Sequence, residues 1–124
     1  MIFLDTHAVV WLYQKELNRF SSVGLDRLEE DSLYISPAVL LELEYLYEIK
    51  RITLDGPSIL QYLEDRIGLE TDGISFLPVS ERAVPLKWTR DPFDRLIVAQ
   101  ADFHGADLLT GDEKIRENYS RAFW

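Results

Sequence analysis

The sequence predicts an α/β protein in which a parallel sheet carries helices on both faces. Short apolar runs alternate along the chain with longer stretches that have helical periodicity or helix-capping residues. This alternation is typical of βαβ units, whose strands lie parallel in one sheet. The chain has 124 residues, 47% of them hydrophobic, and no cysteine. We therefore expect residues 1–124 to form a single domain around one core.

The first half of the chain is predicted to contain two strands and four helices. Residues 1–4 are almost entirely apolar and form a buried strand. Ser21 provides an N-cap for a polar helix, and Pro37 fits the first position of a longer one. Gly56 and the proline after it separate that helix from the next. The predicted strands are residues 1–4 and 33–35, and the predicted helices are residues 7–13, 22–30, 37–50 and 57–67.

The second half is predicted to contain two inner strands, an edge strand and further helices. The apolar run at residues 74–79 predicts a third strand, and Asp91-Pro92 predicts the start of a long helix. Gly105 separates that helix from a fourth strand, and Asp112 precedes a last helical turn. The predicted strands are residues 74–79 and 106–110, with 123–124 at an edge, and the predicted helices are residues 81–88 and 92–104.

The charge balance limits how the protein could bind nucleic acid. Thirteen basic and 22 acidic residues give a net charge of -9, whereas a protein that binds RNA mainly by neutralising phosphates is expected to be basic. Binding of nucleic acid would need local cations or a bound metal. The other explanation of the negative charge is that the acidic residues lie on solvated helices.

No apolar run reaches the ~20 residues of a membrane helix, and the N-terminus lacks a signal peptide's basic flank. We expect a cytoplasmic protein without membrane contact.

Two acidic residues follow predicted strands. Asp5 comes directly after the first strand, and Asp112 comes shortly after the fourth. Ligands of open parallel sheets bind beyond the carboxyl ends of the strands, so both carboxylates would lie at one edge if these strands are neighbours. An Asp between a strand and a helix is also a common N-cap, and either residue alone fits that role.

Two further acidic residues lie on apolar helix faces. At ~100° per residue, the helical neighbours of Glu42 are apolar or aromatic. Asp94 shares a face with Ile97 and Val98, although it also fits a capping arrangement with Asp91. A carboxylate that faces a core must be paired, protonated or bound to a metal. The alternative for Glu42 is an escape to solvent at the sheet edge or a pair with an arginine.

Four convergent carboxylates would require a cation, because like charges at short distance repel one another. Mg²⁺ and Mn²⁺ are the expected ions, since both prefer oxygen ligands. Zinc is not favoured, because the chain has no cysteine and its two histidines, His7 and His104, stand far apart in the sequence.

Four motifs follow one another along the chain. They are Leu4-Asp5-Thr6-His7, Ser36-Pro37-Ala38 followed by Glu42, Arg90-Asp91-Pro92-Phe93-Asp94-Arg95-Leu96 with Ala99-Gln100-Ala101, and Leu109-Thr110-Gly111-Asp112. In this order they resemble the motifs of the PIN-domain ribonucleases, most closely the VapC-type toxins of bacterial toxin–antitoxin pairs. The resemblance covers essentially the whole chain.

The resemblance implies a three-layer α/β/α fold, a Mg²⁺- or Mn²⁺-dependent endoribonuclease, a homodimer and inhibition by a cognate antitoxin. It also implies products with 5′-phosphate and 3′-hydroxyl ends. The positions that match the acidic quartet are Asp5, Glu42, Asp94 and Asp112. Of these, Asp5, Asp94 and Asp112 would hold the metal, and Glu42 would position or deprotonate the attacking water.

Substrate contacts are expected from residues beside these acids. Thr6 and Thr110 match positions where family members often place a hydroxyl near the metal. Arg90 and Arg95 flank Asp94 and could supply the local cations that RNA binding needs; Lys87 is nearby but is expected to be solvated. Two departures from the family pattern concern substrate contacts: Leu41 replaces a common Trp, and Thr89 replaces a common His.

Two other functions remain open at the level of sequence. A degenerate PIN-like domain would only bind a partner, although all four acids are retained. A phosphotransferase that is phosphorylated on Asp5 fits less well, because His7 occupies the position of the second acid in an Asp-x-Asp motif.

If the protein is a toxin, its antitoxin is expected to place a basic side chain in the acidic pocket. Residues that could form a dimer or antitoxin surface are Trp11, Leu12, Tyr45, Leu46 and Tyr47.

Overall fold

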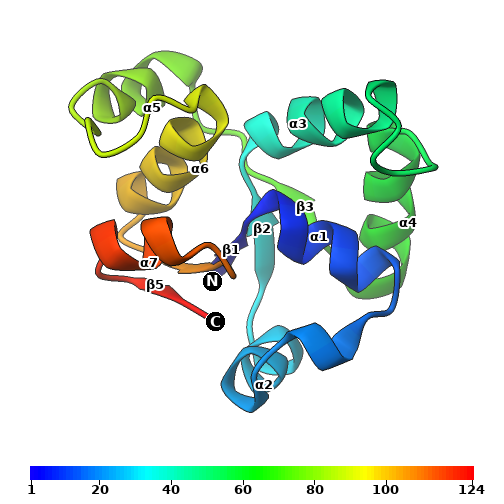
Figure 1. Cartoon of the computed structure of the whole chain (residues 1–124). Helices are drawn as coiled ribbons and strands as arrows, with labels where there is room; N and C mark the ends of the chain where they lie inside the picture. The colour runs from blue at the N-terminus through cyan, green and yellow to red at the C-terminus, as the bar shows by residue number, and fades with distance from the viewer.

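A five-stranded parallel sheet organises the chain, whose residues 1–124 are all described by a computed structural model. The strand order is β3-β2-β1-β4-β5, and every neighbouring pair is parallel (Figure 1). The strands are β1 (Ile2–Leu4), β2 (Leu33–Ile35), β3 (Glu70–Thr71), β4 (Asp107–Leu109) and β5 (Ala122–Phe123). The predicted α/β class with a central parallel sheet is confirmed.

Seven α-helices and one short 3-10 helix connect the strands. They are α1 (Thr6–Tyr13), η1 (Leu17–Arg19), α2 (Ser22–Glu30), α3 (Pro37–Glu48), α4 (Gly56–Ile67), α5 (Phe76–Ala83), α6 (Pro92–Phe103) and α7 (Glu113–Asn118). Every α-helix except α5 follows a residue whose side chain accepts a hydrogen bond from a backbone N–H of the first turn. Such caps fix where a helix starts. They also hold the acidic residues among them close to the strand ends.

The strand order reverses between β1 and β4. From β1 the chain proceeds to β2 and β3, and β4 then pairs with the other side of β1, with Leu4 opposite Leu109. Helices α1, α3 and α4 lie on one side of the central strands, and α5, α6 and α7 lie on the other (Figure 1). Such a switch point is where open α/β sheets bind ligands, beyond the carboxyl ends of the strands.

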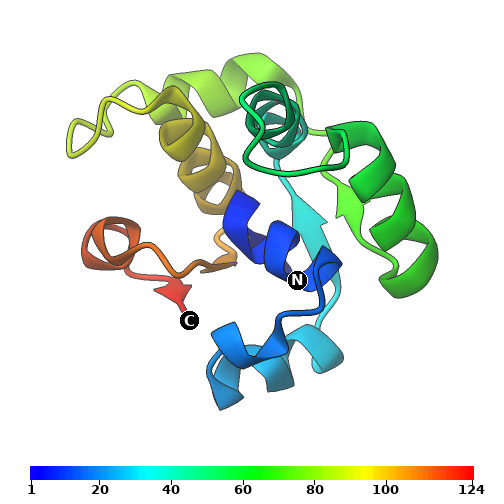
Figure 2. The ribbon, with the colours of Figure 1, turned by 45° about the vertical axis from the view of Figure 1, so that its right-hand side comes forward.

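The core is built around β1. Ile2, Phe3 and Leu4 are all 0% exposed, which places this strand at the centre of the hydrophobic cluster. Each such buried aliphatic or aromatic side chain contributes roughly 1.5–3 kcal/mol relative to an exposed one. Figure 2 shows α1 lying in front of the central strands, between α6 and α4. The start of α1 is therefore held rigidly above the end of β1.

The prediction for residues 74–79 is wrong. These residues are not a strand: Phe76–Ala83 is helix α5, and the third strand is the two-residue Glu70–Thr71 instead. Pro78 explains the helix, because a proline in the first turn loses no helical hydrogen bond, whereas in a strand it would remove a ladder bond. The helix predicted at 81–88 accordingly starts earlier and ends at Ala83.

None of the helices is both long enough and apolar enough to cross a membrane.

Candidate active site

The carboxylate of Asp5 lies at the switch point between β1 and β4. Its backbone N–H donates to Leu109 O at 3.0 Å, which continues the pairing of the two strands past Leu4. Its Oδ1 accepts from the N–H of Thr6 at 2.7 Å, and its Oδ2 accepts from the hydroxyl of Thr110 at 2.7 Å. Burial raises the pKa of Asp5, and these hydrogen bonds partly offset that rise. Asp5 therefore caps α1 and still faces the site.

Thr110 joins the two strand-end acids. Its side chain is completely buried, and its hydroxyl oxygen also accepts from the N–H of Asp112 at 3.1 Å. Asp112 is exposed and caps α7, because its Oδ1 accepts from the N–H of Ile115 at 3.1 Å. The predicted meeting of Asp5 and Asp112 at one sheet edge follows from the pairing of β1 with β4.

Glu42 reaches the same site from α3. The hydroxyl of Thr6 donates to Glu42 Oε1 in a short hydrogen bond that links α1 to α3. The sequence also allowed an ion pair between Glu42 and an arginine, but no arginine pairs with it in the structure. The pKa of Glu42 is raised to about 7, mainly by burial and also by the charges of Asp5 and Asp91.

Asp94 completes the group from the first turn of α6. Asp91 caps this helix by accepting from the N–H groups of Phe93 at 2.8 Å and Asp94 at 3.3 Å. The carboxylate of Asp94 accepts no hydrogen bond from the protein and is half-buried. Its pKa is raised to about 7, mainly by burial. The negative charges that contribute to this rise are those of Asp91, Asp5, Asp112 and Glu42.

The four predicted acids thus converge on one site, from β1, α3, α6 and the end of β4. Their oxygen ligands suit a hard divalent cation, and the repulsion among them is the kind that such a cation relieves. No three of them surround a single point closely enough to form a ready-made metal site. The donor set fits Mg²⁺ or Mn²⁺ chemically, because all of its donors are carboxylate oxygens.

Two threonines predicted to contact substrate are instead fully buried. Thr6 and Thr110 are both 0% exposed, and each hydroxyl donates to a carboxylate of the site. They hold Glu42 and Asp5 in place.

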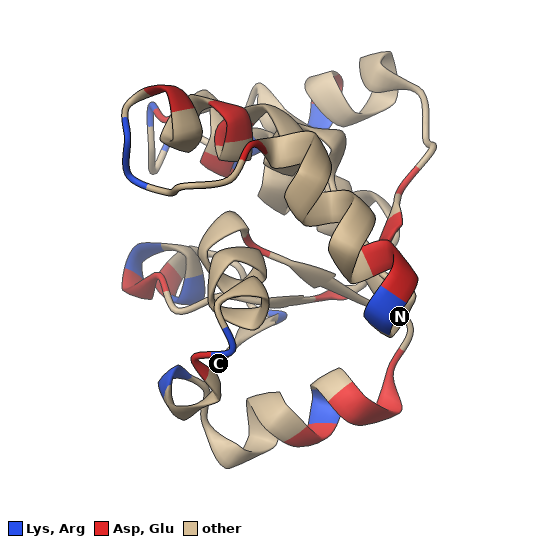
Figure 3. Ribbon diagram, turned by 90° about the vertical axis from the view of Figure 1, so that its right-hand side faces the viewer, with Lys and Arg blue, Asp and Glu red and all other residues tan.

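The predicted cations differ in their surroundings. The Nε of Arg95 donates to Thr89 O at 2.8 Å, so this guanidinium braces the loop before α6. Arg90 and Lys87 are exposed and form no ion pair. Acidic and basic residues are spread over many elements rather than gathered into one basic face (Figure 3). An anionic ligand would therefore have to be bound by local cations rather than by an extended basic face.

A chain of polar side chains links the start of α3 to α6, and no sequence pattern indicates it. The hydroxyl of Ser36 donates to Gln100 Oε1 at 3.3 Å, and the amide of Gln100 donates to Asp72. His104 Nε2 lies 2.8 Å from the same Asp72 carboxylate. Because Glu42 and Asp94 belong to these two helices, this chain sets their separation. Gln100 lies in the motif that contains Asp94, but nothing in the sequence indicates which residues it contacts.

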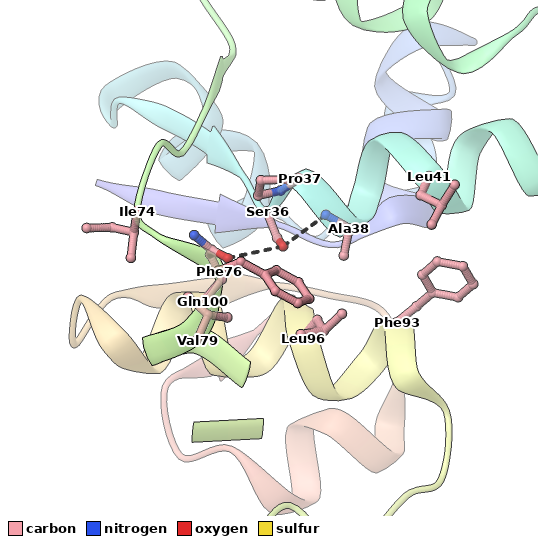
Figure 4. Close-up of a pocket in the computed structure, with 10 residues that line it drawn as sticks. All are labelled: Ser36, Pro37, Ala38, Leu41, Ile74, Phe76, Val79, Phe93, Leu96 and Gln100. Carbon is pink, nitrogen blue, oxygen red and sulfur yellow. Dashed lines mark hydrogen bonds between the residues drawn. The ribbon is translucent and has the colours of Figure 1, made fainter. Parts of the chain in front are cut away.

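One hollow contains two of the acids, and another is lined by residues next to the other two in the sequence. A small one is lined by Asp5, His7, Trp11, Gly111 and Asp112 and has a volume of about 210 Å³. A larger and mainly apolar one, of about 340 Å³, lies between α3, α5 and α6 (Figure 4). Leu41 and Phe93, the residues before Glu42 and Asp94, line this second hollow, with Ser36 and Gln100 among its polar residues.

The apolar residues predicted to form a partner surface divide into two groups. Trp11, Leu12 and Leu46 are partly buried and pack against the core. Tyr45 and Tyr47 are 50% and 41% exposed. Of these five residues, the two tyrosines are the most exposed.

Comparisons with known proteins agree with one another. The sequence model of the PIN domain matches residues 2–120. The chain is 34% identical over 121 residues to Ribonuclease VapC22 of Mycobacterium tuberculosis, covering 94% of this chain and 91% of that protein. Similar solved structures include VapBC2 from Rickettsia felis bound to a promoter DNA fragment, with 23% identity, a TM-score of 0.66 and coverage of 94% and 92%. A toxin–antitoxin complex from Klebsiella pneumoniae has 17% identity, a TM-score of 0.67 and coverage of 100% and 97%.

Proposed function

The chain belongs to the PIN domain family as a ribonuclease toxin of the VapC type, and we propose that it hydrolyses RNA with a divalent metal ion bound at the acidic site. The observation that carries the metal proposal is the convergence of four carboxylates at the β1–β4 switch point. Two of them have pKa values raised to about 7. Carboxylates placed so close together destabilise the fold by their mutual repulsion. A cation bound among them would relieve that repulsion.

Asp5, Asp94 and Asp112 are the proposed metal ligands. Asp94 has a carboxylate without a protein partner, so it is free to turn toward an ion. A bound Mg²⁺ or Mn²⁺ would neutralise the phosphate oxygens and lower the pKa of coordinated water.

Glu42 is the proposed base. With a pKa near 7, its carboxylate is able to accept a proton from the attacking water and to release it again at neutral pH. Thr6 and Thr110 are positioning residues in this scheme, because they hold Glu42 and Asp5 without reaching solvent. The family resemblance implies that the P–O3′ bond breaks, with O3′ taking up a proton, so in-line attack by the water held at Glu42 would leave a 5′-phosphate and a 3′-hydroxyl. Arg90 is a candidate for phosphate binding, and Arg95 is a candidate only if it leaves Thr89.

RNA cleavage by purified protein tests the proposal. The wild type is expected to cleave single-stranded RNA with Mg²⁺ or Mn²⁺ and to lose activity in EDTA. Asp5→Asn is expected to be inactive while melting close to the wild type, because Asn Oδ1 still accepts from the N–H of Thr6 and Asn Nδ2 is able to donate to the hydroxyl oxygen of Thr110. Equal cleavage by wild type and Asp5→Asn, or undiminished cleavage in EDTA, would contradict it.

The other candidate functions have weaker support. A module that only binds a partner would have no use for four convergent carboxylates, and calorimetric titration with Mn²⁺ separates the two functions. Phosphorylation of Asp5 is disfavoured, because both carboxylate oxygens accept hydrogen bonds and the residue is only 6% exposed.

An antitoxin and a second copy of the chain are the proposed protein partners. A basic side chain of the antitoxin would be attracted to the acidic site, because no basic residue of the chain forms an ion pair with these acids.

For the homodimer, the proposed surface is formed by exposed apolar residues around the larger hollow, which are Leu41, Phe76, Leu77 and Val84. Co-expression with the neighbouring gene product tests the antitoxin, which is expected to co-purify with the chain. Sedimentation analysis tests the homodimer, which Phe76→Glu is expected to dissociate.

A further inference from the structure

A third hollow runs along one face of α1. It has a volume of about 220 Å³, and its floor is made by α1 residues spaced three or four apart, which lie on one helix face. The residues that line it are His7, Val10, Trp11 and Gln14 from α1, Glu16 and Arg19 around η1, and Leu46, Arg51 and Ile52 from α3 and the loop after it. These nine residues are called the α1 groove below.

The α1 groove is continuous with the acidic site. His7 and Trp11 line both the groove and the small hollow that contains Asp5 and Asp112. On α3, Leu46 lies one helical turn beyond Glu42, so the same helix borders the site and then the groove. A chain-like ligand that leaves the acidic site along α1 therefore enters this groove.

An exposed aromatic ring stands at the junction. His7 is exposed, and its ring centroid lies 5.9 Å from that of Trp11. Trp11 is fixed from behind by Trp124, at 5.3 Å between ring centroids, and by the guanidinium of Arg19, at 5.1 Å from its ring. His7 is thus an accessible ring on a rigid support. Unpaired bases stack on aromatic rings of this kind.

Two guanidinium groups line the groove away from the acids. Arg19 is held by Glu16 at 2.7 Å, whereas Arg51 is exposed and has no carboxylate partner. In a chain with a net charge of -9, an unpaired arginine in this groove is a local attraction for phosphate. The groove therefore combines a stacking ring near the acids with a phosphate-binding cation further along.

We infer that the α1 groove binds the single-stranded RNA segment next to the scissile phosphate, with a base stacked on His7 and a backbone phosphate on Arg51. The inference rests on the proposed ribonuclease function and adds the subsite that positions the strand. It requires an unpaired strand, because a base inside a duplex cannot reach the His7 ring.

Steady-state cleavage of a short, fluorescently labelled single-stranded RNA tests the inference. His7→Ala is expected to raise KM about tenfold with little change in kcat, whereas His7→Phe, which keeps a ring, is expected to retain the wild-type KM. Arg51→Gln is expected to raise KM and to reduce the dependence of KM on salt by about one ion. Arg66→Gln on α4 is the control, because it makes the same charge change at an exposed arginine that also lacks an ion pair.

The outcomes separate this inference from the proposed function. Wild-type cleavage that Asp5→Asn abolishes, combined with unchanged KM in His7→Ala and Arg51→Gln, overturns the groove and leaves the ribonuclease intact. An equal rise in KM for His7→Ala and His7→Phe overturns base stacking. If the groove variants lose only the antitoxin, the groove belongs to the protein partner. Absence of any RNA cleavage by the wild type overturns both proposals.

Discussion

Thr110 shows how a single buried hydroxyl organises the site. It donates to Asp5 and accepts from the backbone of Asp112, so it holds the two strand-end acids at a fixed separation. Neither contact involves solvent, because the residue is completely buried. Positioning of this kind is invisible in the sequence, where Thr110 fits a substrate contact equally well.

Thr110→Val is expected to lower kcat by about 10- to 100-fold, because the proposed metal ligand Asp5 loses the group that orients it. The loss of a donor to a buried carboxylate is also expected to cost about 1–3 kcal/mol of stability. The measurements are RNA cleavage and thermal melting. Thr110→Ser is the matched control, since it keeps the hydroxyl; if both variants are equally impaired, the hydroxyl is not the cause.

The raised pKa of Asp94 predicts how stability depends on pH without metal. Because the folded pKa is about 7 and the ordinary value is 3.8, the folded state holds this proton more tightly than the unfolded state does. Stability is then highest below pH about 4 and falls as the pH rises to about 7. Asp94→Asn removes the carboxylate that causes this loss of stability. In EDTA at pH 8 the variant is therefore expected to melt several degrees higher than the wild type. Near pH 3.5 both proteins are expected to melt at the same temperature.

Asp26→Asn on the exposed face of α2 is the control for Asp94→Asn, since it removes the same charge away from the site. An equal gain in both variants would mean that net charge alone, rather than the acidic site, limits stability.

At the scale of elements, the close crossing of α3 and α4 depends on Gly56. A Cβ at this position would lie 2.9 Å from Leu40 O and 3.1 Å from Glu44 N, which are backbone atoms that cannot move aside. Gly56→Ala is therefore expected to destabilise the protein by about 1–3 kcal/mol. Gly73→Ala, where no atom lies within 4 Å of the added Cβ, is expected to melt like the wild type; equal melting of both variants would show that the crossing tolerates the methyl group.

Helix caps and buried strands account for what the sequence predicts well. Strands β1, β2 and β4 are apolar, and Ser21, Ser36 and Asp91 mark helix starts, so these elements were predicted with nearly correct bounds. Strand β3 was missed because Glu70–Thr71 is exposed and has no apolar pattern. Short apolar runs do not distinguish a strand from a helix, and α5 is the example.

The site was predictable to a similar extent. Glu42 and Asp94 are detectable because each places a charge on an apolar helix face. The network of Ser36, Gln100 and Asp72 was not, because it joins residues whose proximity depends on tertiary packing. His7 and Arg51 escape the sequence for the same reason: the groove they line is made by α1 and the loop after α3 together.

At the scale of the whole molecule, metal binding is expected to stabilise the fold, because it relieves repulsion among acids that come from four separate segments. At 100 times the dissociation constant, Mn²⁺ is expected to add about 2.7 kcal/mol, visible as a higher melting temperature that EDTA reverses. Asp5→Asn is expected to lose most of this shift. A shift of equal size in both proteins would place the ion elsewhere.

The strand order also has a consequence for synthesis on the ribosome. Strand β1 is made first, yet its neighbour β4 begins at Asp107 and the last acid is Asp112. A nascent chain therefore holds Asp5 for most of translation without strand β4, which brings Asp112 to the same edge of the sheet. With the proposed acids as its catalytic groups, the protein is expected to gain ribonuclease activity only after nearly all of the polypeptide has emerged.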